Sequence, residues 1–342
     1  MKKQLATIER FIYRHRVPFL GGLALLLVAL PFMGASNFFM RIVINIGVFA
    51  MLGLGLNMLT GVTGLVSLGH AGFMAIGGYA TVVLMTRLEW NFFAAALVGA
   101  VLAGLAGWLI GMPSLRLSGN YLTIVTLGFG ELVRLVIMTW TDVTNGMMGI
   151  FNIPRPRIFG LELTLANNGL YYLMLAFLLV ATLSSFSIMN SRTGRAFLAV
   201  REDEIAATMM GIHIRKFKVL AFVISAMITG FAGAFYAPFL GFIDHNTFDF
   251  NLSILIISVV IIGGMGTIRG MFLGAIVLIA FPEVARPLME FRFVIYGLLL
   301  ILMMRFRPQG LLGWRSTLPF QGTLSKEETS RKELFRKRRL VQ

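Results

Sequence analysis

The chain has 342 residues, of which 57% are hydrophobic and 13% are charged, whereas about a quarter of an ordinary globular domain is charged. Lysine and arginine outnumber aspartate and glutamate by 30 to 15, yet apolar runs long enough to cross a bilayer exclude a soluble nucleic-acid-binding protein. The absence of cysteine excludes disulfides, thiolate metal sites and a cysteine nucleophile.

The N-terminal residues 1–16 are basic and precede the apolar run 17–33. A basic segment before an apolar run is typical of a secretory signal peptide, and residues 34–36 weakly resemble a small-residue cleavage site. The run is longer than the usual apolar core of a signal peptide, and many apolar runs follow it. We therefore favour a retained first membrane span.

Apolar runs along the chain have lengths near the roughly 20 residues that a helix needs to cross about 30 Å of hydrocarbon. The expected spans are residues 17–33, 39–59, 64–86, 92–112, 119–140, 168–189, 217–239, 251–268, 270–285 and 292–304. The last two are short enough to be tilted, broken or partly re-entrant. The sequence thus predicts an all-α polytopic membrane protein of about ten transmembrane helices, with a transmembrane domain over 17–304.

Both ends of the chain are rich in lysine and arginine, which the cytoplasmic segments of membrane proteins retain. The N-terminus 1–16 and the tail 305–342 are therefore expected in the cytoplasm, and ten spans satisfy this. The same order places the arginine-rich loop 190–216 inside and the loop 141–167 outside, although the latter contains two arginines. Anionic lipid headgroups attract such a basic tail by about 1 kcal/mol per basic residue.

Two glycine-rich stretches, 61–72 and 263–270, lie inside or beside expected spans. Small residues let helices approach closely, and they also allow a helix to break inside a membrane protein. Close packing explains most single glycines. Hydrogen-bonding side chains beside the first stretch favour a translocation pathway instead. The candidate pathway residues are Asn57, Thr60, Gly61, Gly64, Ser67, Gly69, His70, Gly263, Gly264 and Gly266.

Ionisable residues are few inside the expected spans, where each is a functional candidate. Glu131 and Arg134 are three residues apart, so we expect them to pair on one helix face. His70 stands alone and is expected to be packed and hydrogen-bonded. The sequence contains no catalytic triad, no metal-ligand spacing and no phosphate-binding loop. It predicts neither an enzyme nor a chain that hydrolyses ATP itself.

The inside loop 190–216 contains a short helix signal. Asp203 is an N-cap candidate, Glu204 lies at the positive end of the expected helix, and Gly211 is suited to end it. This helix is expected to expose Ile205, Met209 and Ile212 along one side. It is too short to span a membrane, so it is expected to dock into a groove of a soluble partner.

At these residues the chain resembles the permease subunits of branched-chain amino acid ABC transporters. The resemblance is carried by residues 56–79 (LNMLTGVTGLVSLGHAGFMAIGGY), 201–236 (REDEIAATMMGIHIRKFKVLAFVISAMITGFAGAFY) and 262–275 (IGGMGTIRGMFLGA). Importer permeases have a Glu-Ala-Ala-x-x-x-Gly motif in the helix that contacts the ATPase.

Most of that ATPase-contacting motif is present in this chain. Ala206, Ala207 and Gly211 match it, whereas Ile205 replaces the glutamate and Glu204 comes one place early. The resemblance therefore implies ATPase-coupling residues at Asp203, Glu204, Ala206, Ala207 and Gly211.

The resemblance also implies a bacterial inner-membrane complex. Its expected partners are two ATP-binding subunits, a second homologous permease, a periplasmic substrate-binding protein and membrane lipid, with no nucleic acid. This chain is expected to bind no cofactor, because ATP and Mg are used by the ATPase subunits. Branched-chain amino acids are the expected substrates, and urea, short amides and aromatic acids stay open.

Two other function classes predict different features. An ion-coupled secondary transporter would work without an ATPase, but a proton-coupled carrier is expected to bury more carboxylates than this chain does. A membrane-embedded enzyme would need catalytic polar residues clustered at one depth. Dependence of uptake on a co-expressed ATPase separates the three.

Overall fold

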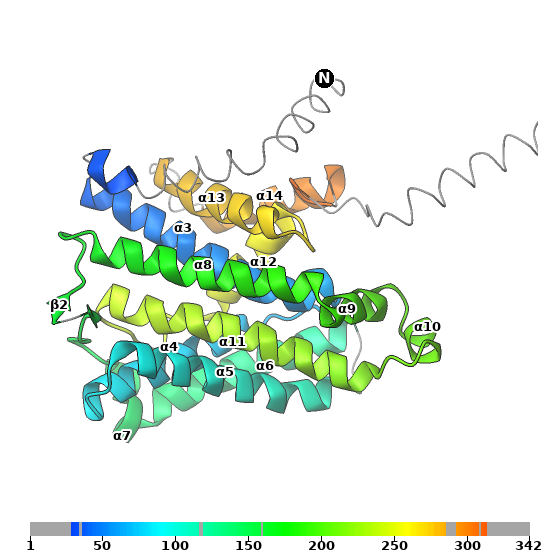
Figure 1. Cartoon of the computed structure of the whole chain (residues 1–342), viewed down its shortest axis with the longest axis horizontal. Helices are drawn as coiled ribbons and strands as arrows, with labels where there is room; N and C mark the ends of the chain where they lie inside the picture. The colour runs from blue at the N-terminus through cyan, green and yellow to red at the C-terminus, as the bar shows by residue number, and fades with distance from the viewer. Residues whose placement is uncertain are drawn as a thin grey trace, which may run out of the picture.

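A computed structural model of the chain describes residues 29–33, 36–115, 119–158, 160–284, 292–307 and 309–312. Within these residues the fold is helical apart from one short hairpin (Figure 1). The elements are η1 (Leu30–Met33), α3 (Asn37–Leu56), η2 (Asn57–Val62), α4 (His70–Arg87), α5 (Phe92–Ser114), α6 (Asn120–Thr139), α7 (Thr141–Thr144), η3 (Gly146–Met148), β1 (Arg157–Ile158), β2 (Leu161–Glu162), α8 (Gly169–Asn190), α9 (Arg192–Glu202), α10 (Glu204–Met209), α11 (Ile214–Leu240), α12 (Phe250–Gly263), α13 (Ile268–Val284) and α14 (Arg292–Phe306).

Helices suited to a membrane dominate the described residues and confirm the all-α polytopic class. Those long and apolar enough to cross a membrane are Asn37–Val62, Phe92–Pro113, Asn120–Thr139, Gly169–Asn190 and Ile214–Leu240. Three shorter apolar helices are Phe250–Gly263, Ile268–Ala280 and Val294–Met303. Nine of the ten expected spans correspond to a helix. The expected first span lies outside the described residues except for 29–33, as does the tail beyond residue 312.

The helix pairs that pack most closely use glycine at their contacts. A side-chain carbon at Gly77 of α4 would overlap the backbone of Gly230 in α11, and one at Gly107 of α5 would lie 2.7 Å from the Phe222 carbonyl oxygen. Without a Cβ, these backbones approach closely and gain dispersion contacts. α4, α5 and α11 therefore pack tightly against one another. α3 packs against α11 and also against α8 and α13 (Figure 1).

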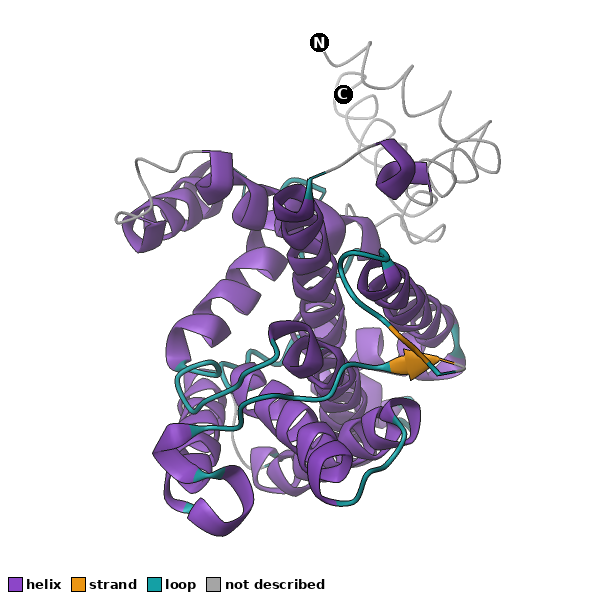
Figure 2. Ribbon diagram, turned by 90° about the vertical axis from the view of Figure 1, so that its left-hand side faces the viewer, coloured by secondary structure: helices purple, strands orange, loops and turns teal. Residues whose placement is uncertain are grey.

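Loops and the hairpin cover one end of the bundle, which faces the viewer in Figure 2. An antiparallel bridge joins Ile150 to Ile243 there. Arg134 pairs with Glu131 at 3.3 Å, as expected, and also donates to the Asn246 side chain at 3.0 Å. Helices α9 and α10 lie at the opposite end (Figure 1). The loops 141–167 and 190–216 are thus at opposite ends, as the span order requires.

The loop at the hairpin end contained the arginines that ran against the positive-inside rule. In the structure Arg157 of β1 forms an ion pair with Glu162 of β2, and the two residues are register partners. One of the two conflicting charges is therefore neutralised within the hairpin.

The expected span 64–86 was wrong at its start, because α4 begins at His70. The preceding α3 continues as the π-helix η2, after which Gly64 has a φ of +81°. That left-handed conformation suits glycine and ends the helix. A second departure is α12, whose 14 residues rise only about 21 Å. The carbonyls of Ile262 and Gly263 at its end accept hydrogen bonds from the backbone of 311–312.

Candidate functional site

The break between α3 and α4 contains the first group of candidate residues. Thr60 Oγ1 donates to the Leu65 carbonyl and Thr63 Oγ1 donates to the Met58 carbonyl, each at 3.0 Å. These hydroxyls satisfy backbone groups that an interrupted helix leaves without partners, which a buried break requires. Short π-helices such as η2 often occur at functional sites.

The two glycine-rich stretches meet at Asn57. Its Oδ1 accepts a hydrogen bond of 2.7 Å from the backbone N–H of Gly266 in the turn between α12 and α13. Gly61 fits beneath this contact, since a side-chain carbon there would overlap both the Asn57 amide and the Gly266 backbone. Gly264 and Gly266 have φ values of +116° and +81°. Asn57 is fully buried, and its hydrogen bond to Gly266 joins two breaks that lie far apart in sequence.

His70 begins α4 inside a buried hydrogen-bond network. Ser225 Oγ donates its single proton to the Gly55 carbonyl at 2.6 Å, so it accepts from His70 Nε2 at 2.8 Å. His70 Nδ1 then accepts from Ser67 Oγ at 3.2 Å. The network assigns a neutral imidazole with its proton on Nε2. His70 is packed and hydrogen-bonded, as expected, and it fixes the start of α4 against α11.

The other candidate glycines have packing or backbone roles in the structure. A side-chain carbon at Gly69 would overlap the Thr126 carbonyl, and one at Gly263 would overlap the Gly270 carbonyl. Gly64 has a backbone role, because its φ of +81° is the left-handed conformation that ends the preceding helix. The structure thus brings Asn57 and Gly61 together with Gly266, and Ser67 together with His70; among the candidate pathway residues, Gly64 is exposed. Their role in translocation stays a prediction.

The short helix of the inside loop has the ends predicted for it. Asp203 accepts from the backbone of Ile205 at 2.7 Å and of Ala206 at 3.0 Å. Gly211 has a φ of +81°, its N–H donates to the Thr208 carbonyl, and the next N–H donates to the Ala207 carbonyl. This pair of bonds is a Schellman motif. Both ends of α10 are thus fixed by side-chain and backbone capping.

The exposed side of α10 is apolar. Ile205, Met209 and Met210 are 73%, 81% and 82% exposed, and we call these three residues the α10 knob. Figure 1 shows α10 projecting from the end of the bundle. Ala206 is exposed, whereas Ala207 is only 4% exposed and packs inside its own chain. Ile212, expected on the exposed side, is half-buried. Of the two alanines, only Ala206 is therefore accessible to a partner.

Glu204 forms an internal ion pair. Its Oε1 lies 2.6 Å from Nζ of Lys218, whose side chain is 5% exposed on α11. The carboxylate neutralises a buried ammonium, which would be costly if it were unpaired. Glu204 therefore holds α10 onto α11. Sequence reasoning did not identify Lys218 as a site residue, because the chain doubles back between the two partners.

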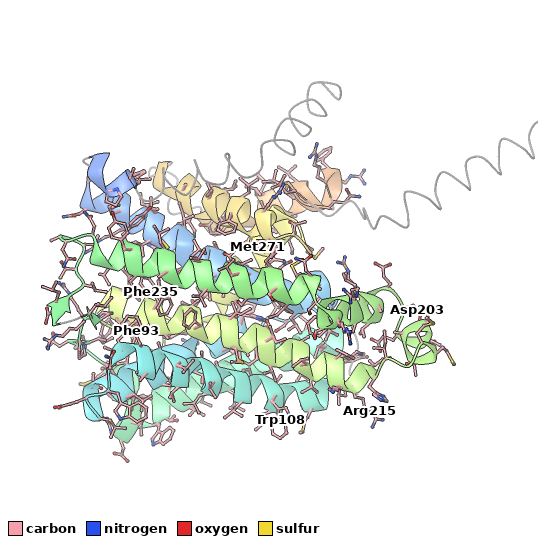
Figure 3. The ribbon with its side chains drawn as sticks, viewed as in Figure 1. Phe93, Trp108, Asp203, Arg215, Phe235 and Met271 are labelled. Atoms are coloured by element: carbon pink, nitrogen blue, oxygen red, sulfur yellow. The ribbon has the colours of Figure 1, made fainter. Side chains whose placement is uncertain are left out.

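A second contact connects the inside loop to the break. The Arg201 guanidinium, at the end of α9, donates to the Gly61 carbonyl in η2. A side-chain carbon at Gly64 would lie 3.0 Å from Arg201 Cγ. Sequence reasoning placed Arg201 in the inside loop and in the stretch that carries the resemblance, but did not predict this contact. Figure 3 shows Asp203 and Arg215 at this same end of the bundle. The end of α9, just before the N-cap of α10, is therefore in direct contact with the interrupted helix at η2.

Within the described part of the chain, no cluster of three or more histidine or carboxylate side chains has the arrangement of a metal site. The charged groups of the site are instead used within the chain, in the pair Glu204–Lys218 and in the contact of Arg201 with a backbone carbonyl. These two contacts connect the inside loop to α11 and to the break between α3 and α4.

Comparisons with known proteins identify the family of the chain. The family model described as branched-chain amino acid transport system, permease component, matches residues 38–304. The high-affinity branched-chain amino acid transport system permease protein LivM of Escherichia coli is 40% identical over 316 residues, covering 86% of this chain and 74% of that protein. LivH of the same organism is 26% identical over 284 residues, covering 78% and 91%.

A more distant relative is the probable LivM of Methanocaldococcus jannaschii, which is 23% identical over 316 residues and covers 78% of this chain and 90% of that protein. No solved structure matches the chain. The family model spans most of the chain, and the E. coli LivM identity is high over the same region. The chain belongs to the family of permease components of branched-chain amino acid transport systems.

Proposed function

We propose that the chain is a membrane-spanning permease of a binding-protein-dependent ABC importer of branched-chain amino acids. Family membership supports the transport role, and the similarity to both LivM and LivH supports a second, homologous permease as partner. The proposed complex adds two ATP-binding subunits and a periplasmic binding protein in a bacterial inner membrane. ATP and Mg are used by the ATPase subunits. Both termini of this chain are cytoplasmic.

The observation that carries the proposal is the α10 knob. Exposed apolar side chains on a rigidly capped helix at the end of a membrane bundle are suited to a groove on a soluble subunit. The knob lies at the end that the arginine-rich loop 190–216 assigns to the cytoplasm. A cytoplasmic ATPase is the partner that an importer requires at this surface.

Two contacts carry movement from the knob into the membrane. The ion pair of Glu204 with Lys218 connects α10 to α11, and Arg201 connects α9 to the Gly61 carbonyl beside the break. When ATP binding draws the docked α10 knobs together, α11 and η2 move with them. Packed interfaces of this kind switch between discrete arrangements rather than deforming smoothly. The break between α3 and α4 is the element that changes access.

The test is reconstitution of the chain with its candidate partners in proteoliposomes. The expected result is leucine uptake that requires both the binding protein and ATP, and co-purification of the ATPase with the permease. Met209→Asp in the α10 knob is expected to abolish both, because it places a charge in an apolar interface. Uptake driven by an ion gradient without the ATPase would show a secondary carrier instead. Uptake of urea in place of leucine would correct the substrate.

A further inference from the structure

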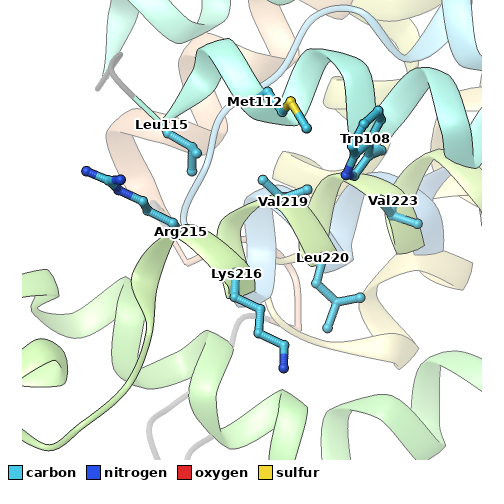
Figure 4. A pocket seen from close by; sticks show the side chains of 8 residues that line it. All are labelled: Trp108, Met112, Leu115, Arg215, Lys216, Val219, Leu220 and Val223. Carbon is cyan, nitrogen blue, oxygen red and sulfur yellow. The ribbon is translucent and has the colours of Figure 1, made fainter.

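A groove of about 640 Å³ lies between the last turns of α5 and the first turns of α11 (Figure 4). Its volume is within the range of sites that hold small organic ligands. Trp108 and Met112 of α5 and Val219 and Val223 of α11 form an apolar lining, and Arg215 and Lys216 add positive charge. None of the candidate pathway residues lines this groove.

The groove has a charged end and an apolar end. α11 begins at Ile214, beside α10, so Arg215 and Lys216 are in its first turn. Val223 lies two turns further along, about 12 Å deeper at 1.5 Å per residue. Figure 4 shows the Arg215 side chain extending away from Trp108, which lies at the other end with Val223. An amphiphilic ligand with one anionic end matches this polarity.

The basic residues at the charged end have no ion-pair partner among the described residues. The first turn of α11 contains no acidic residue, and its N-cap, His213, makes no side-chain capping bond. Basic side chains at the positive end of a helix dipole are unfavourable without a counter-charge. Lys218, one turn on, has Glu204, but neither Arg215 nor Lys216 forms an ion pair among the described residues.

The apolar end opens toward the outside of the bundle. Trp108, which lines this end, is 47% exposed, and Leu105 and Leu109 on the same helix are 56% and 62% exposed. An apolar outer face of a membrane-spanning helix is in contact with acyl chains. An acyl chain can enter the groove from this face without leaving the hydrocarbon, which an acidic soluble peptide cannot do.

We propose that this groove binds an anionic phospholipid from the leaflet on the α10 side. The lipid phosphate binds Arg215 and Lys216, and one acyl chain lies along Trp108, Met112 and Val219. Basic pockets between transmembrane helices on the cytoplasmic side bind anionic headgroups in this way. The site lies where α10 joins α11, so a bound lipid would stabilise the start of α11.

Trp108 provides a direct probe. The chain has four tryptophans, and replacing Trp90, Trp140 and Trp314 with phenylalanine leaves Trp108 as the sole fluorophore. The full-length chain is reconstituted in phosphatidylcholine with a small fraction of phosphatidylglycerol, and the acyl chains of one or the other lipid are brominated. The two brominated lipids are compared at equal mole fraction. Brominated phosphatidylglycerol is expected to quench Trp108 as if its local concentration were about thirtyfold higher than that of brominated phosphatidylcholine, because two basic residues attract its headgroup.

Matched variants distinguish a specific site from general charge. Arg215→Gln with Lys216→Gln should remove the preference, and exchanging the two residues for each other should retain it. Arg192→Gln with Arg195→Gln removes the same charge from exposed positions of α9 and should leave the preference unchanged. Circular dichroism and thermal melting confirm that each variant is folded.

Three results would overturn the proposal. One is equal quenching by the two lipids in the parent, and another is a preference that survives the Arg215 and Lys216 substitutions. The third is loss of quenching when a second permease is co-assembled, which would show that the groove is a protein interface. The measurement uses the chain without an ATPase, so its failure is distinct from failure of the proposed importer function.

Discussion

Replacing Arg201 with glutamine tests whether the inside loop controls the break. Arg201 is on the surface of α9, but its guanidinium reaches the Gly61 carbonyl of η2. The shorter, neutral glutamine side chain cannot span the same distance. The substitution therefore removes this contact and leaves the α10 knob and the pair of Glu204 with Lys218 in place.

The size of the effect follows from the type of bond. A hydrogen bond from a charged donor contributes about 1.5–3 kcal/mol, and the lower value applies because Arg201 is partly solvated. If the bond forms in only one of the two access states, its loss shifts their equilibrium by about 1.5 kcal/mol. That corresponds to roughly a tenfold change in population. We expect about tenfold less leucine uptake per ATP hydrolysed.

The assay compares leucine uptake and ATP hydrolysis in the same proteoliposomes. Arg201→Gln should lower uptake while the ATPase stays bound and active. Arg195→Gln is the matched control, since Arg195 lies on the same helix and, among the described residues, donates only to the nearby Asn190 carbonyl. An unchanged ratio of uptake to hydrolysis in Arg201→Gln would refute the proposed link. Loss of ATPase binding would show that Arg201 acts at the docking surface instead.

Further substitutions separate docking from folding. Met209→Asp should change thermal stability by less than about 0.5 kcal/mol, because Met209 is 81% exposed, yet abolish ATPase co-purification; retained binding would contradict docking at α10. Ala207→Arg should destabilise the chain by more than about 2 kcal/mol even without an ATPase, because it buries an unpaired charge; a wild-type melting temperature would contradict this. Gly211→Val should cost about 1–2 kcal/mol at its left-handed φ, and more than Gly211→Asn; equal melting temperatures would argue against that strain. Partial burial alone would raise the pKa of Asp244, but hydrogen bonds from Thr247 and Asn246 outweigh it and hold that pKa below its usual value. The stabilisation from Asp244 is thus present above its ordinary pKa of about 4 and is lost as pH falls through the lowered pKa. Asp244→Asn should therefore flatten the dependence of thermal stability on pH below about pH 4; an unchanged profile would refute it.

Features that depend on neighbouring residues were predictable from the sequence. The long apolar runs gave nine of the described helices, because their length matches the hydrocarbon thickness. The caps at Asp203 and Gly211 and the pair of Glu131 with Arg134 were also predicted. Each of these follows from contacts within one or two helical turns, which spacing alone specifies.

The start of α4 shows where that local reasoning ends. An apolar run can continue as a helix or break, and hydropathy does not distinguish the two. Here the break at 63–69 is stabilised by distant partners, such as Thr126, whose hydroxyl accepts from the Leu68 backbone. The burial of Ala207 has a similar origin, since the side of α10 that faces inward is set by the ion pair with α11.

By itself the sequence determined the helical membrane class, most span positions and the capped helix that carries the α10 knob. Only the tertiary structure decided what those elements contact. The Arg201–Gly61 contact joins residues 140 apart, and the Asn57–Gly266 bond joins residues 209 apart. Nothing in the local pattern identifies such a partner, because a buried polar group can be satisfied by any donor or acceptor that the packed helices bring within reach. The spatial arrangement of the packed helices decides which partner each buried polar group contacts.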